Sequence, residues 1–458
     1  MAHTPSSPAF DPKAVRRVVV ASSIGTVIEW YDFALYGVAS ALVFGPLFFP
    51  SQSSVAGTLA SFAVFAVAFF VRPIGGLIAA HVGDRVGRKP VLIFTITLMG
   101  AATVAVGLLP TYETVGAWAP VLLLITRILQ GIGAGAEFAG AVTTVAEYAP
   151  AARRGLYTSF AQASVGAAFV LSTGFFSILA TIPEDVLLGW AWRVPFLASV
   201  VIFAVALFIR RRIEETPDFV RTKEAMRDTA DGKSPARKIP VVQALRERPR
   251  HLMVGLLCGS GLNVAGYLVN TFSLSYLKNT LGVSATVATV GVVVAVGSSI
   301  VAVPLFGRLS DRVGRVPVMA GGALFMALYI PPYFLLLQTE RPVLIVVAMT
   351  IAYGVGQSAM LGSQSAFLSE LFETRYRFTA IAFSRELNVM VLGGTTPFIA
   401  TALVAVADGP WLVVAFVVVC QALTLLALVL ARSPRTRAER EDTGKPDGED
   451  RAAVTSAL

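Results

Sequence analysis

The chain has 458 residues, of which 55% are hydrophobic and only 14% are charged, with a formal net charge of +9. Soluble domains carry about 25% charged residues, so this composition excludes an ordinary soluble protein. The positive charge stands in short polar segments between long apolar ones, which is typical of membrane topology and not of nucleic-acid binding.

Twelve apolar segments of about 20 residues or more follow one another, and each could cross a ~30 Å hydrocarbon layer as an α-helix. The alternating pattern of membrane β-strands is absent from them. The sequence therefore predicts an all-α membrane protein with twelve transmembrane helices. The segments are residues 17–45, 54–80, 91–110, 117–146, 156–181, 191–209, 251–277, 285–306, 317–337, 342–369, 378–406 and 410–431.

Most of the 37 Lys and Arg residues lie in the two tails, in the polar segment 210–250 and in every second loop. Basic residues collect on the cytoplasmic side of membrane proteins, so both termini are predicted to be cytoplasmic. Residues 1–16 contain no removable signal. We expect a multi-pass protein of the plasma membrane, the inner membrane of a bacterial cell.

Two motifs occur twice, once in each half of the chain. The octapeptide "DRVGRKPV" at 84–91 returns as "DRVGRVPV" at 311–318, and "EYAPAARRG" at 147–155 resembles "ELFETRYRF" at 370–378. Such duplication predicts two pseudo-symmetric six-helix bundles, an architecture that in transporters binds substrate between the repeats. The predicted parts are a tail at 1–16, a bundle at 17–210, a cytoplasmic loop at 211–250, a bundle at 251–431 and a tail at 432–458.

The repeated motifs predict a cytoplasmic latch, in which arginines pair with acids while glycines allow tight turns. If the basic residues only set the topology, the preserved spacing of Asp, Gly and Pro would remain unexplained. The predicted latch residues are Asp84, Arg85, Gly87, Arg88, Glu147, Arg154, Asp311, Arg312, Gly314, Arg315, Glu370 and Arg377.

Charged residues inside the apolar segments are the strongest indications of function, because each costs about 2.5–3.5 kcal/mol on insertion scales unless it is paired or hydrated. In the first segment Glu29, Asp32 and Tyr36 step by three or four residues and share one helical face. The remaining intramembrane charges are Arg72, Arg127, Glu137, Arg385 and Glu386.

These four acids outnumber the three arginines, so at least one acid lacks a full partner. Burial favours the neutral form of such an acid, which makes it a candidate proton carrier. We expect this role first for Asp32 and then for Glu29 and Glu137. The alternative is a static Asp–Arg pair that joins the first and fourth helices.

Arginine binds carboxylates through its planar fork, so Arg127 and Arg385 are the candidate residues for an anionic substrate. Further polar residues at helical spacing could line the same cavity, although polar residues also join helices to one another. Arg72 could be structural, at the bend marked by "RPIGG". The other predicted substrate-binding residues are Gln130, Tyr36, Asn263, Tyr267, Tyr353, Gln357 and Asn388.

Six motifs together resemble the major facilitator superfamily and, within it, the metabolite:proton symporter family. The resemblance spans essentially the whole chain and departs from the superfamily pattern at Ala80, where a glycine is usual. The motifs are "EWYDF" (29–33), "RPIGG" (72–76), "RILQGIGAG" (127–135), "WRVPF" (192–196), "EETPDF" (214–219) and "GRLSDRVGRVP" (307–317).

This resemblance implies alternating access, with the first, fourth, seventh and tenth helices lining the cavity and a small organic acid taken up together with a proton. It leaves two alternatives open: symport of a zwitterionic osmolyte such as proline or betaine, and export or uniport by the same fold. We expect a monomer in the lipid bilayer with no enzyme activity, cofactor, metal or nucleic-acid partner. Three histidines without neighbours at ligand spacing argue against a metal site.

Overall fold

The computed structural model describes residues 12–50, 53–86, 88–135, 145, 149–150, 153–212, 248–372 and 377–432. These residues form α-helices joined by short 3-10 and π-helical turns, with no β-strand among them. The prediction of an all-α protein is confirmed.

The first half of the chain supplies five long helices, α1, α3, α4, α8 and α10, and the shorter apolar helix α6. Short helices stand between α1 and α3, between α4 and α6, and between α8 and α10. The bounds are α1 Pro12–Leu42, α2 Phe44–Phe48, α3 Ser54–Val86, α4 Arg88–Leu108, α5 Tyr112–Val115, α6 Trp118–Ala134, α8 Arg154–Leu179, α9 Glu184–Gly189, the 3-10 helix η2 Ala191–Arg193 and α10 Val194–Arg212.

The second half differs in that π-helical turns, which often occur at functional sites, interrupt three of its long helices. One is α13 Pro249–Cys258, α14 Ser260–Tyr267, η3 Leu268–Phe272, α15 Ser273–Ser275 and η4 Tyr276–Thr280. The others are α18 Pro342–Ile351, η5 Ala352–Gln357 and α19 Ser358–Leu371, and then α20 Arg377–Asn388, η6 Val389–Gly393 and α21 Thr396–Ala407. The uninterrupted helices are α16 Ala285–Val313, α17 Arg315–Leu337 and α22 Trp411–Arg432.

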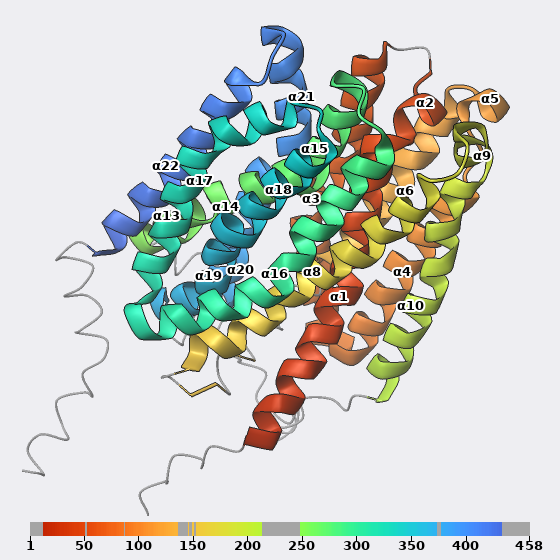
Figure 1. Cartoon of the computed structure of the whole chain (residues 1–458). Helices are drawn as coiled ribbons and strands as arrows, with labels where there is room; N and C mark the ends of the chain where they lie inside the picture. The colour runs from red at the N-terminus through yellow and green to blue at the C-terminus, as the bar shows by residue number, and fades with distance from the viewer. Residues whose placement is uncertain are drawn as a thin grey trace, which may run out of the picture.

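Ten helical segments of the described residues are long and apolar enough to cross a membrane, and α6 is a shorter apolar helix. The total of twelve and the cytoplasmic location of both termini stay predictions. Figure 1 shows the helices of the first half on one side of the molecule and those of the second half on the other. The domain boundaries at 17–210 and 251–431 also stay predictions.

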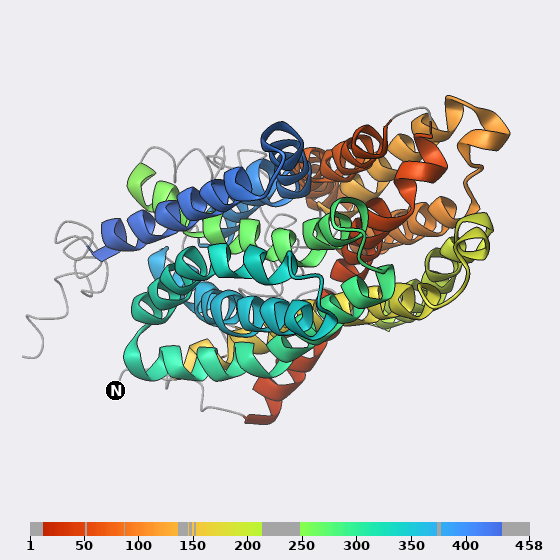
Figure 2. The same cartoon turned by 45° about the horizontal axis from the view of Figure 1, so that its top comes forward.

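The two halves meet along α8 and α16, which lie side by side in both views (Figures 1 and 2). Glycines make this approach possible: a Cβ on Gly155 would lie 2.6 Å from the carbonyl oxygen of Gly307, and one on Gly166 would lie 2.7 Å from Ser299 Oγ. A second contact between the halves joins α3 to α20 and α21, where Gly394 packs on the Phe69 ring.

The motif "WRVPF" closes one end of the first bundle. Trp192 is fully buried against Phe44 and Phe48, with ring centroids 6.0 and 5.9 Å apart. Arg193 donates hydrogen bonds to the carbonyl oxygens of Gly107 and Leu109, at 3.0 and 2.5 Å. These carbonyls lie at the C-terminal end of α4, where the last carbonyl oxygens have no N–H donors from their own helix and a cation is favoured.

Close contact between α3 and α6 is the reason for two glycine-rich motifs, "RPIGG" and "GIGAG". A Cβ on Gly131 would lie 2.6 Å from the carbonyl oxygen of Ala68, and one on Gly76 would lie 2.9 Å from that of Gly135. Small residues that let helix backbones approach are typical of membrane helix interfaces. The contact fixes the position of Arg72 on α3 relative to Arg127 on α6.

Replacing Gly131 by Ala should destabilise the protein by about 1–3 kcal/mol, the usual cost of overpacking, and lower the melting temperature in detergent. The matched control is Gly174→Ala in α8, where an added Cβ meets no atom within 4 Å. Alanine at Gly174 should be neutral or stabilising because it is the better helix former. Equal melting temperatures for the two variants would contradict this packing.

Candidate functional site

Asp32 lies inside the first bundle and has 0% exposure. Its Oδ1 atom accepts a hydrogen bond from Gln130 Nε2 at 2.7 Å and another from the Thr103 hydroxyl. Gln130 also accepts from Arg127 Nη1 at 3.2 Å. Side chains from α1, α4 and α6 therefore form one polar group, which we call the Asp32 group: Asp32, Thr103, Arg127 and Gln130.

The ion pair in this group is loose. Arg127 Nη1 lies 3.9 Å from Asp32 Oδ2, and neither this oxygen nor Arg127 Nη2 has a hydrogen bond to any described residue. Arg127 is also enclosed by aromatic rings, with its guanidinium 4.2 Å from the Tyr36 ring centroid, 4.8 Å from that of Phe33 and 5.1 Å from that of Phe65. Desolvated cation–π contacts stabilise such a cation independently of a carboxylate.

A partly open cavity lies between the two halves, with about 460 Å³ of empty space that includes its opening to solvent. Aromatic rings, amides and one arginine face it. The lining residues are Trp30, Gln162, Val165, Phe169, Leu262, Asn263, Gly266, Tyr267, Asn270, Tyr353, Gln357, Leu361, Gln364 and Arg385.

Several polar atoms at this cavity have no hydrogen bond within the described part of the chain: the Tyr267 hydroxyl, Asn270 Oδ1 and Gln357 Oε1. All three side chains belong to residues that are at most 5% exposed. A buried polar group without a partner costs about 1–3 kcal/mol, so these atoms favour a ligand that offers hydrogen bonds to them.

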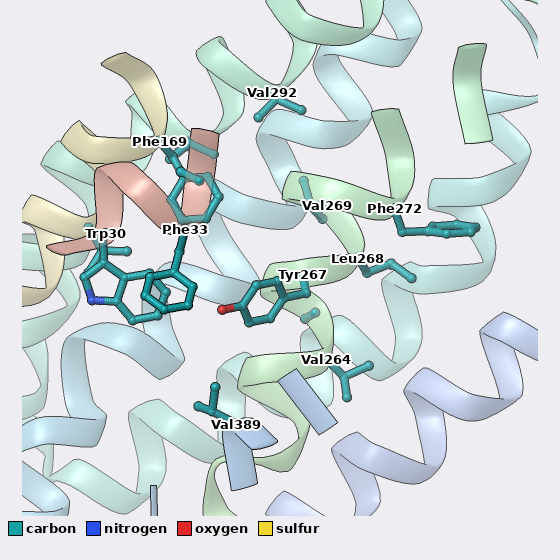
Figure 3. Packing of buried hydrophobic residues seen from close by; sticks show 14 of the residues in the cluster. Trp30, Phe33, Phe169, Val264, Tyr267, Leu268, Val269, Phe272, Val292 and Val389 are labelled. Atoms are coloured by element: carbon teal, nitrogen blue, oxygen red, sulfur yellow. The ribbon is translucent and has the colours of Figure 1, made fainter. Parts of the chain in front are cut away.

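The Asp32 group reaches the cavity through packed aromatic rings. Phe65, which contacts Arg127, lies 6.0 Å from Tyr267 between ring centroids, and Phe69 lies 5.7 Å from it. Figure 3 shows the Tyr267 hydroxyl pointing toward Phe33 and Trp30. Tyr267 belongs to the second half of the chain, so this aromatic contact connects the two halves.

Of the predicted substrate-binding residues, Asn263, Tyr267, Tyr353, Gln357 and Arg385 line the cavity. Asn388 lies directly behind the wall and accepts a hydrogen bond from Asn263 at 2.7 Å.

The other three predicted residues, Arg127, Gln130 and Tyr36, do not line this cavity. They surround Asp32 inside the first bundle and are fully buried.

Glu29 lies near the contact between the two halves and is not part of the Asp32 group. It pairs with Arg72 of α3, which also contacts Glu386 of α20 through Nε at 3.3 Å. Arg385, next in the chain, lies on the cavity wall with its guanidinium 6.0 Å from the Trp30 ring centroid. Arg72 was expected as a possible structural residue at a bend, whereas here it holds acids from both halves of the chain.

The second copy of the repeated motif joins the halves at one face of the molecule. Asp311 accepts hydrogen bonds from the backbone N–H groups of Gly155 and Leu156, both at 2.9 Å, and so caps the start of α8. Arg315 pairs with Asp311 at 2.5 Å and with Glu370 at 3.2 Å.

Two other predicted latch residues, Arg312 and Gly314, lie where α16 ends and α17 begins. Gly314 has a φ of +98°, a conformation that favours glycine. Arg312 is exposed.

Several predicted residues lie outside this description. Gly87, Glu137 and Glu147 are outside the described residues, and Asp84, Arg85, Arg88 and Arg377 are described only in their backbone. Arg154 begins α8 and is half-buried. The roles proposed for these residues stay predictions.

Sequence reasoning missed several residues of the site. Thr103 binds Asp32 from α4, and Gln162 and Trp30 line the cavity from the first half. A single Thr or Gln in an apolar segment is a weak signal, although Trp30 stands between Glu29 and Asp32 within the "EWYDF" motif. The backbone N–H groups of Gly155 and Leu156, which bind Asp311, carry no side-chain signal at all.

Comparison with known proteins places this geometry in a family. The family model described as Major Facilitator Superfamily matches residues 22–385 and 256–456. The chain is 34% identical over 423 residues to the "Shikimate transporter" of Escherichia coli (strain K12), covering 92% of this chain and 95% of that protein. It is 32% identical over 401 residues to the "Proline/betaine transporter" of the same strain, covering 86% and 79%.

The solved structures support the same fold. A crystal structure of a D-xylose-proton symporter matches with a TM-score of 0.68 at 20% identity, covering 92% of this chain and 97% of that one. At this identity the match shows the fold alone. The family model and the two relatives show more, and the chain therefore belongs to the Major Facilitator Superfamily, as a multi-pass transporter of the cell membrane.

Proposed function

We propose that this transporter takes up a small organic anion together with a proton, by alternating access to the central cavity. The observation that carries this proposal is the loose, fully buried Asp32–Arg127 pair, connected by aromatic rings to a cavity that contains Arg385. The relative named as a shikimate transporter agrees with it. The moving bodies would be residues 17–210 and 251–431, and the working unit a monomer.

Asp32 is suited to gain and lose a proton because its two oxygens differ. Oδ1 is held by Thr103 and Gln130, whereas Oδ2 accepts no hydrogen bond from the described residues. A proton on Oδ2 would leave the contacts of Oδ1 in place and would weaken only the 3.9 Å attraction to Arg127. The three aromatic rings would still stabilise Arg127, so both protonation states of Asp32 are tolerated.

Neutralising Asp32 would change the charge beside Tyr36 and Phe65, two rings that stack on each other. Of these, Phe65 contacts both Arg127 and the cavity-lining Tyr267. A shift of these rings would move the contact between the halves. The same proton would thereby affect both the cavity and the interface, as coupling of two ligands requires. Glu29 and Glu137 remain the second candidates for the proton site.

Substrate binding is proposed at Arg385, because a carboxylate there would find a charged donor in a partly desolvated site. The amides of Asn263, Asn270 and Gln357 would contact the rest of the molecule, and the rings of Trp30 and Tyr267 would pack on its apolar face. The E. coli relative named as a shikimate transporter carries a small hydroxylated acid of this general kind.

A zwitterionic osmolyte is the second candidate, and the aromatic lining favours it. Trp30, Tyr267 and Tyr353 face the same space as Arg385, so a quaternary ammonium group could bind the rings while its carboxylate bound the arginine. Relatives named as proline/betaine transporters support this reading. The substrate test below separates the two.

Replacing Asp32 by Asn should abolish accumulation driven by a pH gradient while substrate counterflow continues, because Asn imitates the protonated acid but cannot release a proton. Uptake of radiolabelled substrate into proteoliposomes, with and without an imposed gradient, measures both. The control is Asp408→Asn at an exposed position. Unchanged gradient-driven accumulation would show that Asp32 is not the coupling residue.

A thermal-shift screen of the purified protein against citrate, 2-oxoglutarate, shikimate, benzoate, proline and betaine should identify an organic acid as the stabilising ligand. Replacing Arg385 by Gln should weaken binding of that acid by about tenfold to a hundredfold, the effect of losing a charged hydrogen bond of about 1.5–3 kcal/mol. The exposed Arg341→Gln variant serves as control. Stabilisation by betaine and none by the acids would favour the second candidate.

A further inference from the structure

A helix that supplies much of the cavity wall in the second half is interrupted inside the membrane-spanning segment that begins at Pro249. There α13 ends at Cys258 and α14 begins at Ser260; Gly259, between them, has φ −84° and ψ −11°, whereas an α-helix has ψ near −42°. Gly259 lies about 15 Å along the helix from Pro249, well inside a ~30 Å hydrocarbon layer. Backbone groups that lose helical partners at this depth need other partners within the protein. We call residues 256–261 the α13–α14 junction.

Two side chains of α22 supply such partners. The Thr424 hydroxyl accepts a hydrogen bond from the Gly261 N–H at 2.9 Å. It also lies 3.3 and 3.4 Å from the carbonyl oxygens of Cys258 and Leu257, and can donate to either. Gln421, on the same face of α22, donates from Nε2 to the carbonyl oxygen of Gly261 at 3.0 Å. Both α22 side chains are fully buried, and side chains inserted in this way between the backbone groups of a helix bend it.

A third side chain holds the junction from α20. Asn388 Nδ2 donates to the carbonyl oxygen of Leu256 at 2.8 Å and to the Ser260 hydroxyl at 3.0 Å. In an unbroken helix the Leu256 carbonyl would instead accept from the Ser260 N–H. Gly261 fits this packing because a Cβ there would overlap the Gln421 amide. Helices α20 and α22 therefore keep the junction open together.

The junction stands directly before the part of the helix that faces the cavity. Five lining residues follow it at the spacing of one helical face, so the direction of that face depends on how α14 leaves the junction. Neither Thr424 nor Gln421 is among the lining residues. The five are Leu262, Asn263, Gly266, Tyr267 and Asn270.

We propose that Thr424 and Gln421 are positioning residues, which keep the α13–α14 junction open and thereby direct Asn263, Tyr267 and Asn270 into the cavity. They do so through backbone groups and do not touch the substrate. The claim concerns the shape of the cavity wall, whichever molecule binds there, so it can fail while the proposed function stands, and the reverse.

The test measures which residues the cavity exposes and needs no known substrate. In a background with Cys258 and Cys420 replaced by Ala, Leu262→Cys reports on the wall after the junction, and Leu361→Cys reports on the wall formed by α19. Each purified protein is treated in detergent with 2-aminoethyl methanethiosulfonate, and the rate of modification is followed by mass spectrometry.

Thr424→Val keeps the branched shape of the side chain but removes its hydrogen bonds. The Gly261 N–H and the carbonyls before it then find partners only within their own helix, so the junction closes toward a regular helix and the face that carries Leu262 turns from the cavity. Labelling of the Leu262→Cys reporter should fall by about threefold to tenfold, as the loss of one net hydrogen bond implies. The Leu361→Cys reporter should keep its rate.

The reference variants make the result specific. Thr424→Ser retains the hydroxyl and should restore the labelling rate. Thr350→Val removes a hydroxyl that donates to the carbonyl of Val346 in its own helix, and should leave both reporters unchanged. If Thr424→Val does not fold, Gln421→Leu carries the same test, since it removes the hydrogen bond to the Gly261 carbonyl.

An unchanged rate at the Leu262→Cys reporter in a folded Thr424→Val or Gln421→Leu variant would overturn the proposal. An equal rise at both reporters would overturn it too, because the α22 side chains would then only hold the packing of the second half together.

Discussion

The interaction on which this structure depends is the ion pair between side chains inside the membrane. Such charges are costly in hydrocarbon unless a partner or water compensates them. Asp32 pairs with Arg127, and Glu29 and Glu386 pair with Arg72. Outside the apolar segments, at one face of the molecule, Asp311 pairs with Arg315 and caps the start of α8. Glycines at the helix contacts bring these partners within reach, so packing and electrostatics are parts of one arrangement.

The ion pairs differ in how they can respond to a change in protonation or to a movement of the two halves. Arg127 and Asp32 lie within one bundle, loosely paired, with aromatic rings that stabilise the arginine when the acid is neutral. Arg72 and Asp311 instead join the two halves, and each has a second partner within its own half. A carrier needs both kinds of pair: one that changes charge with its surroundings, and one that forms and breaks as the cavity opens to either side.

Much of this was predictable from the residues. The apolar segments predicted the helices, and the duplicated octapeptide predicted that Asp311 and Gly314 form part of a latch. The rare intramembrane charges predicted Asp32, Arg127 and Arg385 as candidate functional residues. Helical periodicity shows which residues share a face but not which neighbour that face meets. For this reason Arg127, Gln130 and Tyr36, expected at the cavity, instead enclose Asp32, and the contact of Arg72 with Glu386 could not be foreseen. The π-helical turns depend on tertiary packing and have no clear sequence signal.

The central claim is that binding of the substrate and of a proton are linked through one buried acid. The most direct measurement is the number of protons taken up by the purified protein when substrate is added, followed with a pH indicator in weakly buffered detergent solution. By reciprocal linkage, the account predicts uptake of a proton with each substrate bound over the pH range in which the acid titrates. Substrate binding without any proton uptake, across the whole pH range of stability, would contradict it.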